Sequence, residues 1–281
     1  MNIVLAVDGS KYSRWATDWV HELPLVRLSR VTAVHVVNVA ALRAPFMVQP
    51  MRIGSEGFIR AEAKRLETQA KQVAISTRKL LSRLRDRARV MIKKGPVAPT
   101  ILNLASGRST LIVLGQRGLS NLDRFFLGSV SAQVTVHARC SVLVAKAPAR
   151  PVRRILLAVD GSKSSDQALQ FLLKHMSPTN KGRIEVQVLQ VLPPFVHTKE
   201  AMASVARTTR YTQKLEAAGY IVKDTIRAGD PAGEIIKAAK SFHADLLVVG
   251  AKGLGAVRRF LLGSVSTKLI HHSPCSILVV R

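Results

Sequence analysis

The chain of 281 residues has few acidic, aromatic and cysteine residues. Asp and Glu number 17 against 43 Lys and Arg, and aromatic residues make up 5%. Its two cysteines, Cys140 and Cys275, form no C-x-x-C pair, which favours core residues in a reducing compartment over disulfides. No apolar run approaches the roughly 18 residues of a transmembrane helix, and the N-terminus enters a strand pattern without the basic segment of a signal peptide. The sequence predicts a globular cytoplasmic protein with no membrane span.

Several motifs of nucleotide, metal and nucleic-acid sites are also missing. There is no G-x4-G-K-[ST] loop, and Arg258 takes the place of the third glycine that a dinucleotide fingerprint starting at Gly253 requires. Nothing matches a helix-turn-helix, a zinc finger or an RNP motif. His271 and His272 have no spaced carboxylate partner, and no Ser/His/Asp arrangement recurs. We therefore expect no catalytic residue and no metal ligand set.

What the chain does contain is one glycine pattern, G-x2-G-x9-G-S, that occurs twice. Glycine is needed where a backbone approaches a ligand closely or takes a positive φ. A long match at fixed spacing predicts a matched pair of phosphate-binding loops. The two copies lie 135 residues apart and consist of Gly115, Gly118, Gly128 and Ser129, and of Gly250, Gly253, Gly263 and Ser264.

Other landmarks repeat in the same order. Asp8-Gly9-Ser10 returns as Asp160-Gly161-Ser162, 152 residues later, so the first copy is longer by 17 residues (152 − 135 = 17). We assign most of that excess to an insertion at residues 41–58. Pro148 and Pro151 fall between the copies and extend neither a sheet nor a helix. The sequence predicts two domains, residues 1–147 and residues 152–281.

Short β-branched runs alternate with amphipathic stretches of helical length in both copies. Apolar strands separated by helices indicate parallel sheets with right-handed crossovers. We expect each half to be a doubly wound, Rossmann-like α/β domain with a five-stranded parallel sheet.

In such sheets a ligand binds beyond the carboxyl ends of the strands, where strand order reverses. Asp8 and Asp160 follow the first strand of each half, and the glycine loops follow the fourth. The next helix starts beyond each loop, and its N–H groups and positive end favour an anionic phosphate. The helix starts comprise Ser129, Val130 and Ser131, and Ser264, Val265 and Ser266, whose serine hydroxyls are further expected donors.

Each of these features alone also has a purely structural explanation. An Asp-Gly-Ser sequence after a strand is usually a turn with a helix cap, and a serine at a helix start is usually only a cap. Their joint occurrence in the right order, twice, favours a binding site.

Over nearly its whole length the chain resembles a tandem member of the universal stress protein family (UspA-like), in its ATP-binding branch. The resemblance rests on Val-Asp-Gly-Ser, on G-x2-G-x9-G-[ST] and on the closing His-x-x-Cys-x-[VI]-Leu-Val segment of each half. It implies an adenine nucleotide alpha hydrolase-like sheet of order 3-2-1-4-5. It also implies ATP, expected with Mg, at the glycine loops and the helix starts.

The resemblance assigns roles to further residues. Asp8 and Asp160 are expected to serve the nucleotide sites, and the second-strand backbone to meet adenine. The loose equivalents there are Val36 or Val37 and Val188 or Leu189. Family domains pair through their last strands, so the two halves are expected to form an internal pseudo-dimer, which also covers sheet edges. Homodimers and unknown protein partners are further expectations.

The first half departs more from the family pattern than the second. Gly95-Pro96-Val97 and Ser109-Thr110-Leu111 stand where the second half has Gly229-Asp230-Pro231 and Ala244-Asp245-Leu246. The insertion at residues 41–58 is expected either to cover the first cleft or to obstruct it. The second site is therefore the better supported of the two.

The net charge of +26 is not explained by the family. Such a field attracts nucleotides and promotes salt-sensitive binding to nucleic acid or anionic membrane, although a solvated basic surface is the simpler interpretation. The densest run, residues 80–94, contains six cations and one Asp. Other cations lie inside the glycine loops and are candidate phosphate partners: Arg117, Arg124, Lys252, Arg258 and Arg259.

Three functions remain open at this point. The first is a regulatory, non-enzymatic ATP-binding protein of the stress response. The second is an ATP-hydrolysing enzyme of the same fold, with Asp8 or Asp160 near the metal. The third is a charge-driven binder of nucleic acid or anionic surfaces whose glycine loops no longer bind nucleotide.

Overall fold

The computed structural model describes residues 1–28, 30–38, 55–105, 107, 110–118, 127–179, 183–195, 198–253 and 262–281. Of the predicted insertion, residues 55–58 form the start of a helix, and residues 41–54 lie outside these ranges. Arg124, Arg258 and Arg259 also lie outside them, and their predicted roles stay predictions.

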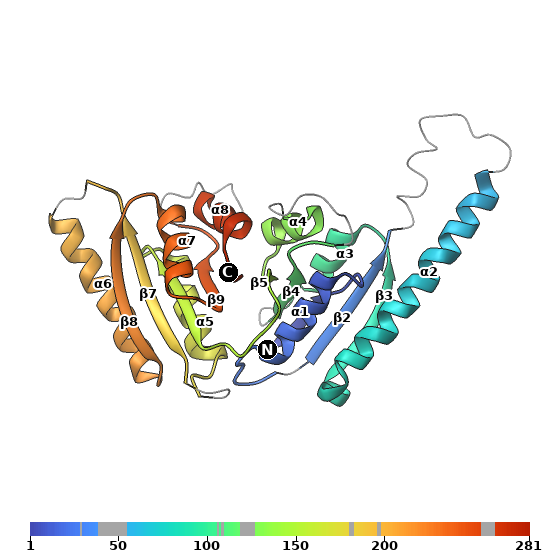
Figure 1. Cartoon of the computed structure of the whole chain (residues 1–281), viewed down its shortest axis with the longest axis horizontal. Helices are drawn as coiled ribbons and strands as arrows, with labels where there is room; N and C mark the ends of the chain where they lie inside the picture. The colour runs from blue at the N-terminus through green and yellow to red at the C-terminus, as the bar shows by residue number, and fades with distance from the viewer. Residues whose placement is uncertain are drawn as a thin grey trace.

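Each half alternates strands and helices as predicted (Figure 1). The first half consists of β1 (Asn2–Ala6), α1 (Lys11–Glu22), β2 (Arg30–Val37), α2 (Ser55–Leu80), the 3-10 helix η3 (Ser82–Arg87), β3 (Ala88–Lys94), α3 (Val97–Leu104), β4 (Thr110–Gly115), α4 (Ser129–His137) and β5 (Ser141–Ala145). The second consists of β6 (Arg154–Val159), α5 (Lys163–His175), β7 (Glu185–Leu192), α6 (Thr198–Ala217), β8 (Ile221–Ala228), α7 (Pro231–Ser241), β9 (Leu246–Gly250), α8 (Ser264–His272) and β10 (Ser276–Val280).

The strands form one ten-stranded sheet in the order β3-β2-β1-β4-β5-β10-β9-β6-β7-β8. Within each half the neighbouring strands are parallel, and the order is 3-2-1-4-5 in both. The predicted doubly wound α/β fold is confirmed. Because β1 and β4 are neighbours, the loops that follow them leave the sheet side by side, and the same holds for β6 and β9.

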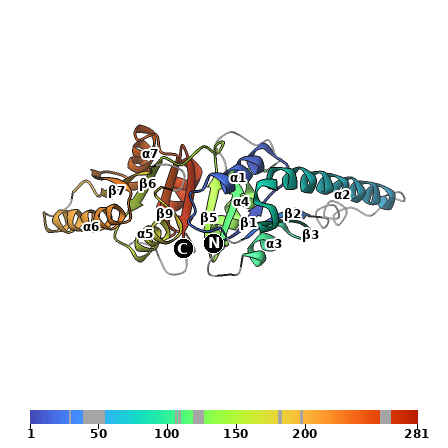
Figure 2. The ribbon, with the colours of Figure 1, turned by 90° about the horizontal axis from the view of Figure 1, so that it is seen from below.

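The two halves join through their last strands, as the resemblance implied. β5 and β10 pair antiparallel, with Val142 opposite Val279, Leu143 opposite Leu278 and Val144 opposite Ile277. Figure 2 shows β5 and the C-terminus side by side at the centre, with α2 and α6 at opposite ends of the molecule. The pairing removes two exposed edges, and β3 and β8 remain as the outer strands. The domain bounds at residues 147 and 152 stay a prediction.

Two apolar cores, one on each face of the sheet, run through both halves. α1 and α5 pack into one core and α3 and α7 into the other. In α1 the buried positions Ala16, Trp19 and Val20, together with the C-cap Leu23, recur at helical spacing. Ser10 caps the first turn by accepting from Ser13 N at 3.1 Å. None of the described helices is long and apolar enough to cross a membrane.

The central junction is closed by two equivalent cations, Lys146 and Arg281, that lie 135 residues apart and directly follow β5 and β10. Lys146 Nζ donates to the carbonyls of His271 and Ser273 at 3.1 and 3.0 Å, at the C-terminal end of α8. Arg281 Nη2 donates to Thr135 O at 2.5 Å, near the end of α4. Each cation thus satisfies carbonyls at the negative end of the other half's last helix.

Burial lowers the pKa of Lys146 to about 8. Because this lies below the ordinary lysine value, the unfolded chain holds the proton more tightly between pH 8 and about 10.5, and the stability contributed by this group rises with pH in that window. Between pH 7.5 and 9.5, the free energy of unfolding of the wild type should rise by about 2 kcal/mol more than that of the Lys146→Met variant. Denaturant unfolding at both pH values measures this, with exposed Lys71→Met as a control that should follow the wild type. Parallel pH profiles for the wild type and Lys146→Met would contradict it.

Candidate functional site

A cleft opens in the first half where the loops after β1 and β4 lie side by side. Its volume is about 250 Å³. One end is apolar and is lined by β2, α3 and β4, and the other is formed by the glycine loop and the start of α4. All the predicted site residues of this half line it: Asp8, Gly115, Gly118, Gly128, Ser129, Val130 and Ser131.

Backbone hydrogen bonds fix the start of the loop to the end of the last strand and to the helix that follows the loop, in the same way in both halves. Gln116 N donates to Ala145 O at 2.8 Å, and Gly128 N donates to Gln116 O at 2.9 Å. Ala251 N donates to Val280 O at 2.9 Å, and Gly263 N to Ala251 O at 2.8 Å. Gly128 and Gly263 are the N-caps of α4 and α8, and no side chain caps either helix. The first-turn N–H groups are therefore not satisfied by a side-chain cap.

The pattern glycines serve close approach, because none of them has a positive φ. A Cβ at Gly115 would lie 2.6 Å from the Tyr12 backbone of α1, and Gly250 meets Ser164 of α5 at the same distance. These two glycines allow a helix to pack on the end of the strand. A Cβ at Gly118 would lie 2.6 Å from Asp8 Oδ2, and the contact between Gly253 and Asp160 repeats this distance. The second glycine of each pattern thus makes room for the aspartate.

Gly128 and Gly263, the third glycines, are less tightly enclosed. A Cβ at Gly128 would lie 3.2 Å from the Cα of Arg117, and one at Gly263 would lie 3.5 Å from the Cα of Lys252. Both therefore face the second residue beyond the opening glycine of their own loop. A larger side chain at either position would push the loop away from the helix start.

Two of the four predicted serine donors have a different role in the structure. Ser131 Oγ donates to Gly115 O at 2.7 Å, and Ser266 Oγ donates to Gly250 O at 2.8 Å. A hydroxyl has one proton, so neither donates to a phosphate while this bond persists. In this structure the two hydroxyls hold the helix start against the strand end, and their predicted role at a phosphate stays a prediction. Ser129 and Ser264 are exposed.

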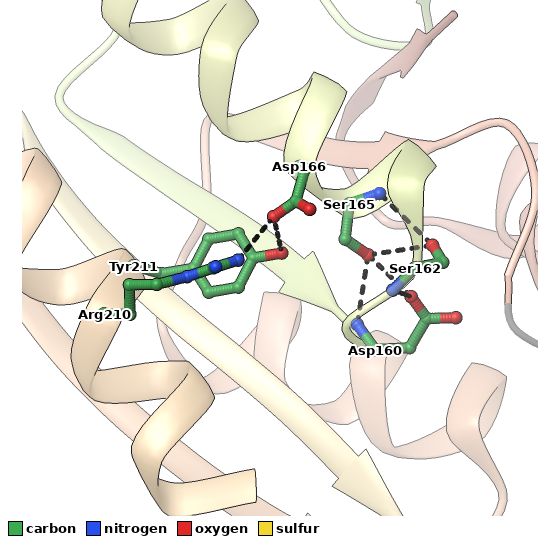
Figure 3. A network of polar contacts seen from close by, with 6 residues as sticks. All are labelled: Asp160, Ser162, Ser165, Asp166, Arg210 and Tyr211. Carbon is green, nitrogen blue, oxygen red and sulfur yellow. Dashed lines mark hydrogen bonds and ion pairs between the residues drawn. The ribbon is translucent and has the colours of Figure 1, made fainter. Parts of the chain in front are cut away.

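The aspartates are held more firmly in the second half than in the first. Asp8 Oδ1 accepts from Ser10 N at 3.0 Å. Asp160 Oδ1 accepts from Ser162 N at 2.9 Å and also from Ser165 Oγ at 2.6 Å (Figure 3). In both halves the other carboxylate oxygen, Oδ2, faces the second glycine of the loop.

The register of β2 and β7 shows which second-strand residues of the two halves correspond. Val36 lines the first cleft together with Val34. Val34 pairs with Ala6, and Leu189 pairs with Ala158 in the second half, so Leu189 corresponds to Val34 and Val191 to Val36. The Val188 side chain belongs to the core on the opposite face of the sheet, and the expected backbone contact with adenine stays a prediction.

Sequence reasoning missed the wall that α3 contributes. Val97 and Ile101 line the cleft together with Leu114 of β4. The i, i+4 spacing of the two α3 residues was a usable signal, since it places both on one helix face. Arg117, one of the loop cations, also lines the cleft.

Comparison with known proteins decides the family. The sequence profile of the universal stress protein family matches residues 1–146 and 151–281. The chain belongs to the universal stress protein family. A universal stress protein of Mycobacterium tuberculosis is 30% identical over 297 residues, which cover 99% of this chain and 96% of that protein. A second from the same organism is 25% identical over 307 residues, with 100% and 95% covered.

A solved structure of a universal stress protein from Archaeoglobus fulgidus has the same overall fold. It superposes with a TM-score of 0.72 at 21% identity, and the match covers 100% of this chain and 98% of that one. The tandem arrangement of two universal stress protein domains therefore extends over the full length of these relatives.

The close contact at Gly115 predicts a stability effect that is independent of any ligand. Gly115→Ala forces α1 away from β4 and should lower the free energy of unfolding by about 1–3 kcal/mol, the usual cost of overpacking. Gly57→Ala in α2 is the control, because its Cβ would meet nothing within 4 Å and alanine favours a helix by up to about 1 kcal/mol. Urea unfolding compares the two variants, and equal stabilities would refute the packing role of Gly115.

Proposed function

We propose that this universal stress protein is a regulatory protein of the cytoplasmic stress response that binds ATP, with Mg, at both glycine loops. The observation that carries the proposal is the division of the first cleft into an apolar end and a backbone N–H end. An adenine nucleotide has the same division, with a flat base at one end and phosphates at the other.

The apolar end suits the base. Val34 and Val36 of β2 form one wall, and Val97 and Ile101 of α3 form another. Apolar pockets with few polar groups are typical of small-ligand sites. The cleft volume of about 250 Å³ lies just below the usual range of such sites, so the base would fill this end and the rest of the nucleotide would extend along the glycine loop.

The other end suits the phosphates. The start of α4 offers N–H groups and the positive end of the helix dipole, which favour an anion. Gly118 brings the loop against Asp8 Oδ2, where any larger residue would occupy the space. Arg117 adds a positive charge to the lining, and the net charge of +26 attracts polyanionic ligands from solution.

Magnesium fits this arrangement as a companion of the phosphates. Within the described ranges, no group of three or more His, Cys, Asp and Glu side chains is arranged to hold a metal. Mg²⁺ is commonly held by one or two carboxylates together with phosphate oxygens and water. Asp8 and Asp160 are the carboxylates placed to contribute, and Mg²⁺ would neutralise phosphate charge there.

The proposed role depends on ATP binding to the protein and not on ATP hydrolysis. A nucleotide hydrolase needs a group that positions the attacking water. The Asp8 and Asp160 carboxylates accept from backbone N–H groups through Oδ1 and face glycine through Oδ2. We propose that the bound nucleotide alters the surface that protein partners recognise, and that any hydrolysis is slow.

Calorimetry with Mg-ATP at moderate salt tests the nucleotide sites. The wild type should bind two molecules of ATP, and Gly128→Val and Gly263→Val should each lose one site, with at least ~10-fold weaker binding there, because the side chain displaces the loop from the helix start. Unfolding midpoints of both variants control for folding. Absence of binding at millimolar ATP would refute the proposal.

A phosphate-release assay separates occupancy from turnover. We expect at most slow ATP hydrolysis by the wild type, and the Asp8→Ala and Asp160→Ala variants test whether any turnover depends on these carboxylates. Steady turnover that both substitutions abolish would instead establish an ATP-hydrolysing enzyme. Affinity for duplex DNA that falls steeply with salt and does not depend on ATP would favour the charge-driven alternative.

A further inference from the structure

Four arginines gather at the amino ends of β2 and β3, the two outermost strands of the first half (Figure 1). Val31 of β2 pairs with Ala88 of β3. Arg30 and Arg87, which directly precede these two residues, therefore lie side by side at the strand starts. We call the whole group the arginine cluster, and it consists of Arg30, Arg85, Arg87 and Arg89.

The arginine cluster is open to solvent and is not neutralised. All four residues are exposed, and no ion pair joins any of them to a residue that the structure describes. Arg89 Nε donates to Thr32 Oγ1 at 3.0 Å, which directs this side chain over β2 on the face that Thr32 shares with Arg30. Asp86, the acidic residue within this segment, is exposed too and pairs with none of the four. The cluster is therefore a concentrated positive charge on the surface.

The strand register gives the equivalent positions in the second half. Val31 of β2 pairs with Ala88 of β3. Its equivalent, Val186 of β7, pairs with Val222 of β8. Positions in β3 and β8 therefore differ by 134 (222 − 88 = 134), and positions in β2 and β7 differ by 155 (186 − 31 = 155). The equivalents of the arginine cluster, in the same order, are Glu185, Gly219, Ile221 and Lys223.

The two outer edges of the ten-stranded sheet thus differ in charge. At these four positions the second half keeps one cation and has one acid, Glu185. Glu185 lies 3.8 Å from Arg154, and Arg227 of β8 lies 3.4 Å from Glu234, so charges on this edge are paired. A common need of the fold does not explain the arginines, because the second half forms the same strands without them.

Arg85 occupies a backbone position that suits glycine. Its φ is 46°, and the equivalent Gly219 also has a positive φ, 92°. A positive φ strains a residue that has a Cβ, whereas glycine adopts it readily. Such strain is concentrated at functional sites. Because Arg85 recovers nothing through an ion pair with a described residue, its side chain is better explained by a partner outside the chain.

We propose that the arginine cluster binds double-stranded nucleic acid through its phosphate groups. The planar guanidinium of arginine matches a phosphate through two parallel N–H bonds, which are charge-assisted. Contacts of this kind hold a protein on a duplex whatever its base sequence. The net charge of +26 adds a long-range attraction that brings the polyanion to the surface.

The surroundings of the cluster favour a duplex over a single strand or a membrane. Proteins bind single strands by stacking bases on aromatic side chains. Residues 24–34 and 81–96 contain no Phe, Tyr or Trp. Proteins that lie on a membrane surface ordinarily use an amphipathic helix with inserted apolar side chains. The cations here belong to two strand starts and to η3, a 3-10 helix of 6 residues.

The arginine cluster is separate from the nucleotide cleft. The cleft lies at the carboxyl ends of the strands, and none of its described lining residues belongs to the cluster. Duplex binding therefore adds to the proposed function and does not depend on it. The charge-driven alternative differs from this proposal, because it requires glycine loops that bind no nucleotide, and the ATP calorimetry decides that point.

Fluorescence anisotropy of a labelled DNA duplex of about 20 base pairs, titrated with the full chain, tests the proposal. We expect saturable binding at about 50 mM salt. If four phosphates are neutralised, the logarithm of the affinity should fall with the logarithm of the salt concentration with a slope of about −3.6. The affinity would then fall about 150-fold between about 50 and 200 mM salt. Absence of binding at the lower salt concentration would overturn the proposal.

Two double variants with the same net charge locate the surface. Arg87→Gln with Arg89→Gln should weaken duplex binding more than ~10-fold and reduce the salt slope by about 2. Lys223→Gln with Arg227→Gln removes two cations from the opposite edge and should leave the affinity within about 2-fold of the wild type. Equal losses in the two variants would show that net charge alone sets the affinity and would refute the assignment. Unfolding midpoints show that both variants fold.

Arg85→Gly separates the proposed role from a structural one. Relief of the strained φ should raise the unfolding midpoint by about 2 °C. Loss of the guanidinium should weaken duplex binding roughly 5-fold, while ATP binding stays unchanged. A raised midpoint with wild-type duplex affinity would contradict the role of Arg85.

Co-sedimentation with phosphatidylserine vesicles tests the membrane as a partner. We expect the Arg87→Gln, Arg89→Gln variant to lose duplex binding in the anisotropy assay. Vesicle binding that this variant abolishes, together with no duplex binding by the wild type, would overturn the proposal in favour of a membrane surface.

Discussion

The antiparallel pairing of β5 with β10 is the contact on which the rest of the molecule depends. It joins two five-stranded sheets into one, and both apolar cores pass across it from half to half. The two strands are buried at all their positions, so their backbone groups would lose their partners if the halves separated. Lys146 and Arg281 reinforce the junction, because each binds the helix end of the opposite half. Neither half is complete at its inner edge without the other.

The two halves are alike on the side of the glycine loops and differ on the side of α1 and α5. The loop after β4 and the loop after β9 repeat the same backbone bonds and the same contact between glycine and aspartate. The α1 and α5 face differs, since Val73 lies against Gly9 where Arg207 lies against Gly161. The two glycine loops therefore have the same geometry, while the packing on the other face of the sheet differs.

Much of the fold was predictable, because its signals are local and occur twice. The alternation of apolar strands with helices gave the doubly wound architecture, and the family resemblance gave the strand order. The site residues of the first half could be named because the motifs are contiguous in sequence. The α3 wall was not recognised, since Val97 and Ile101 reach the cleft only through the crossover packing of α3 on the sheet. The bonds of Ser131 and Ser266 were not predictable either, because a hydroxyl near a helix start has several acceptors within reach.

The covalent link between the halves has an evolutionary consequence. In a symmetric homodimer every substitution appears twice, so a change that benefits one binding site must be tolerated in its copy. A single chain that carries both halves is free of that requirement, and the short connection from β5 to β6 keeps the partner at high effective concentration. One half can therefore change while the other does not, and the different partners of Gly9 and Gly161, Val73 and Arg207, are such a difference.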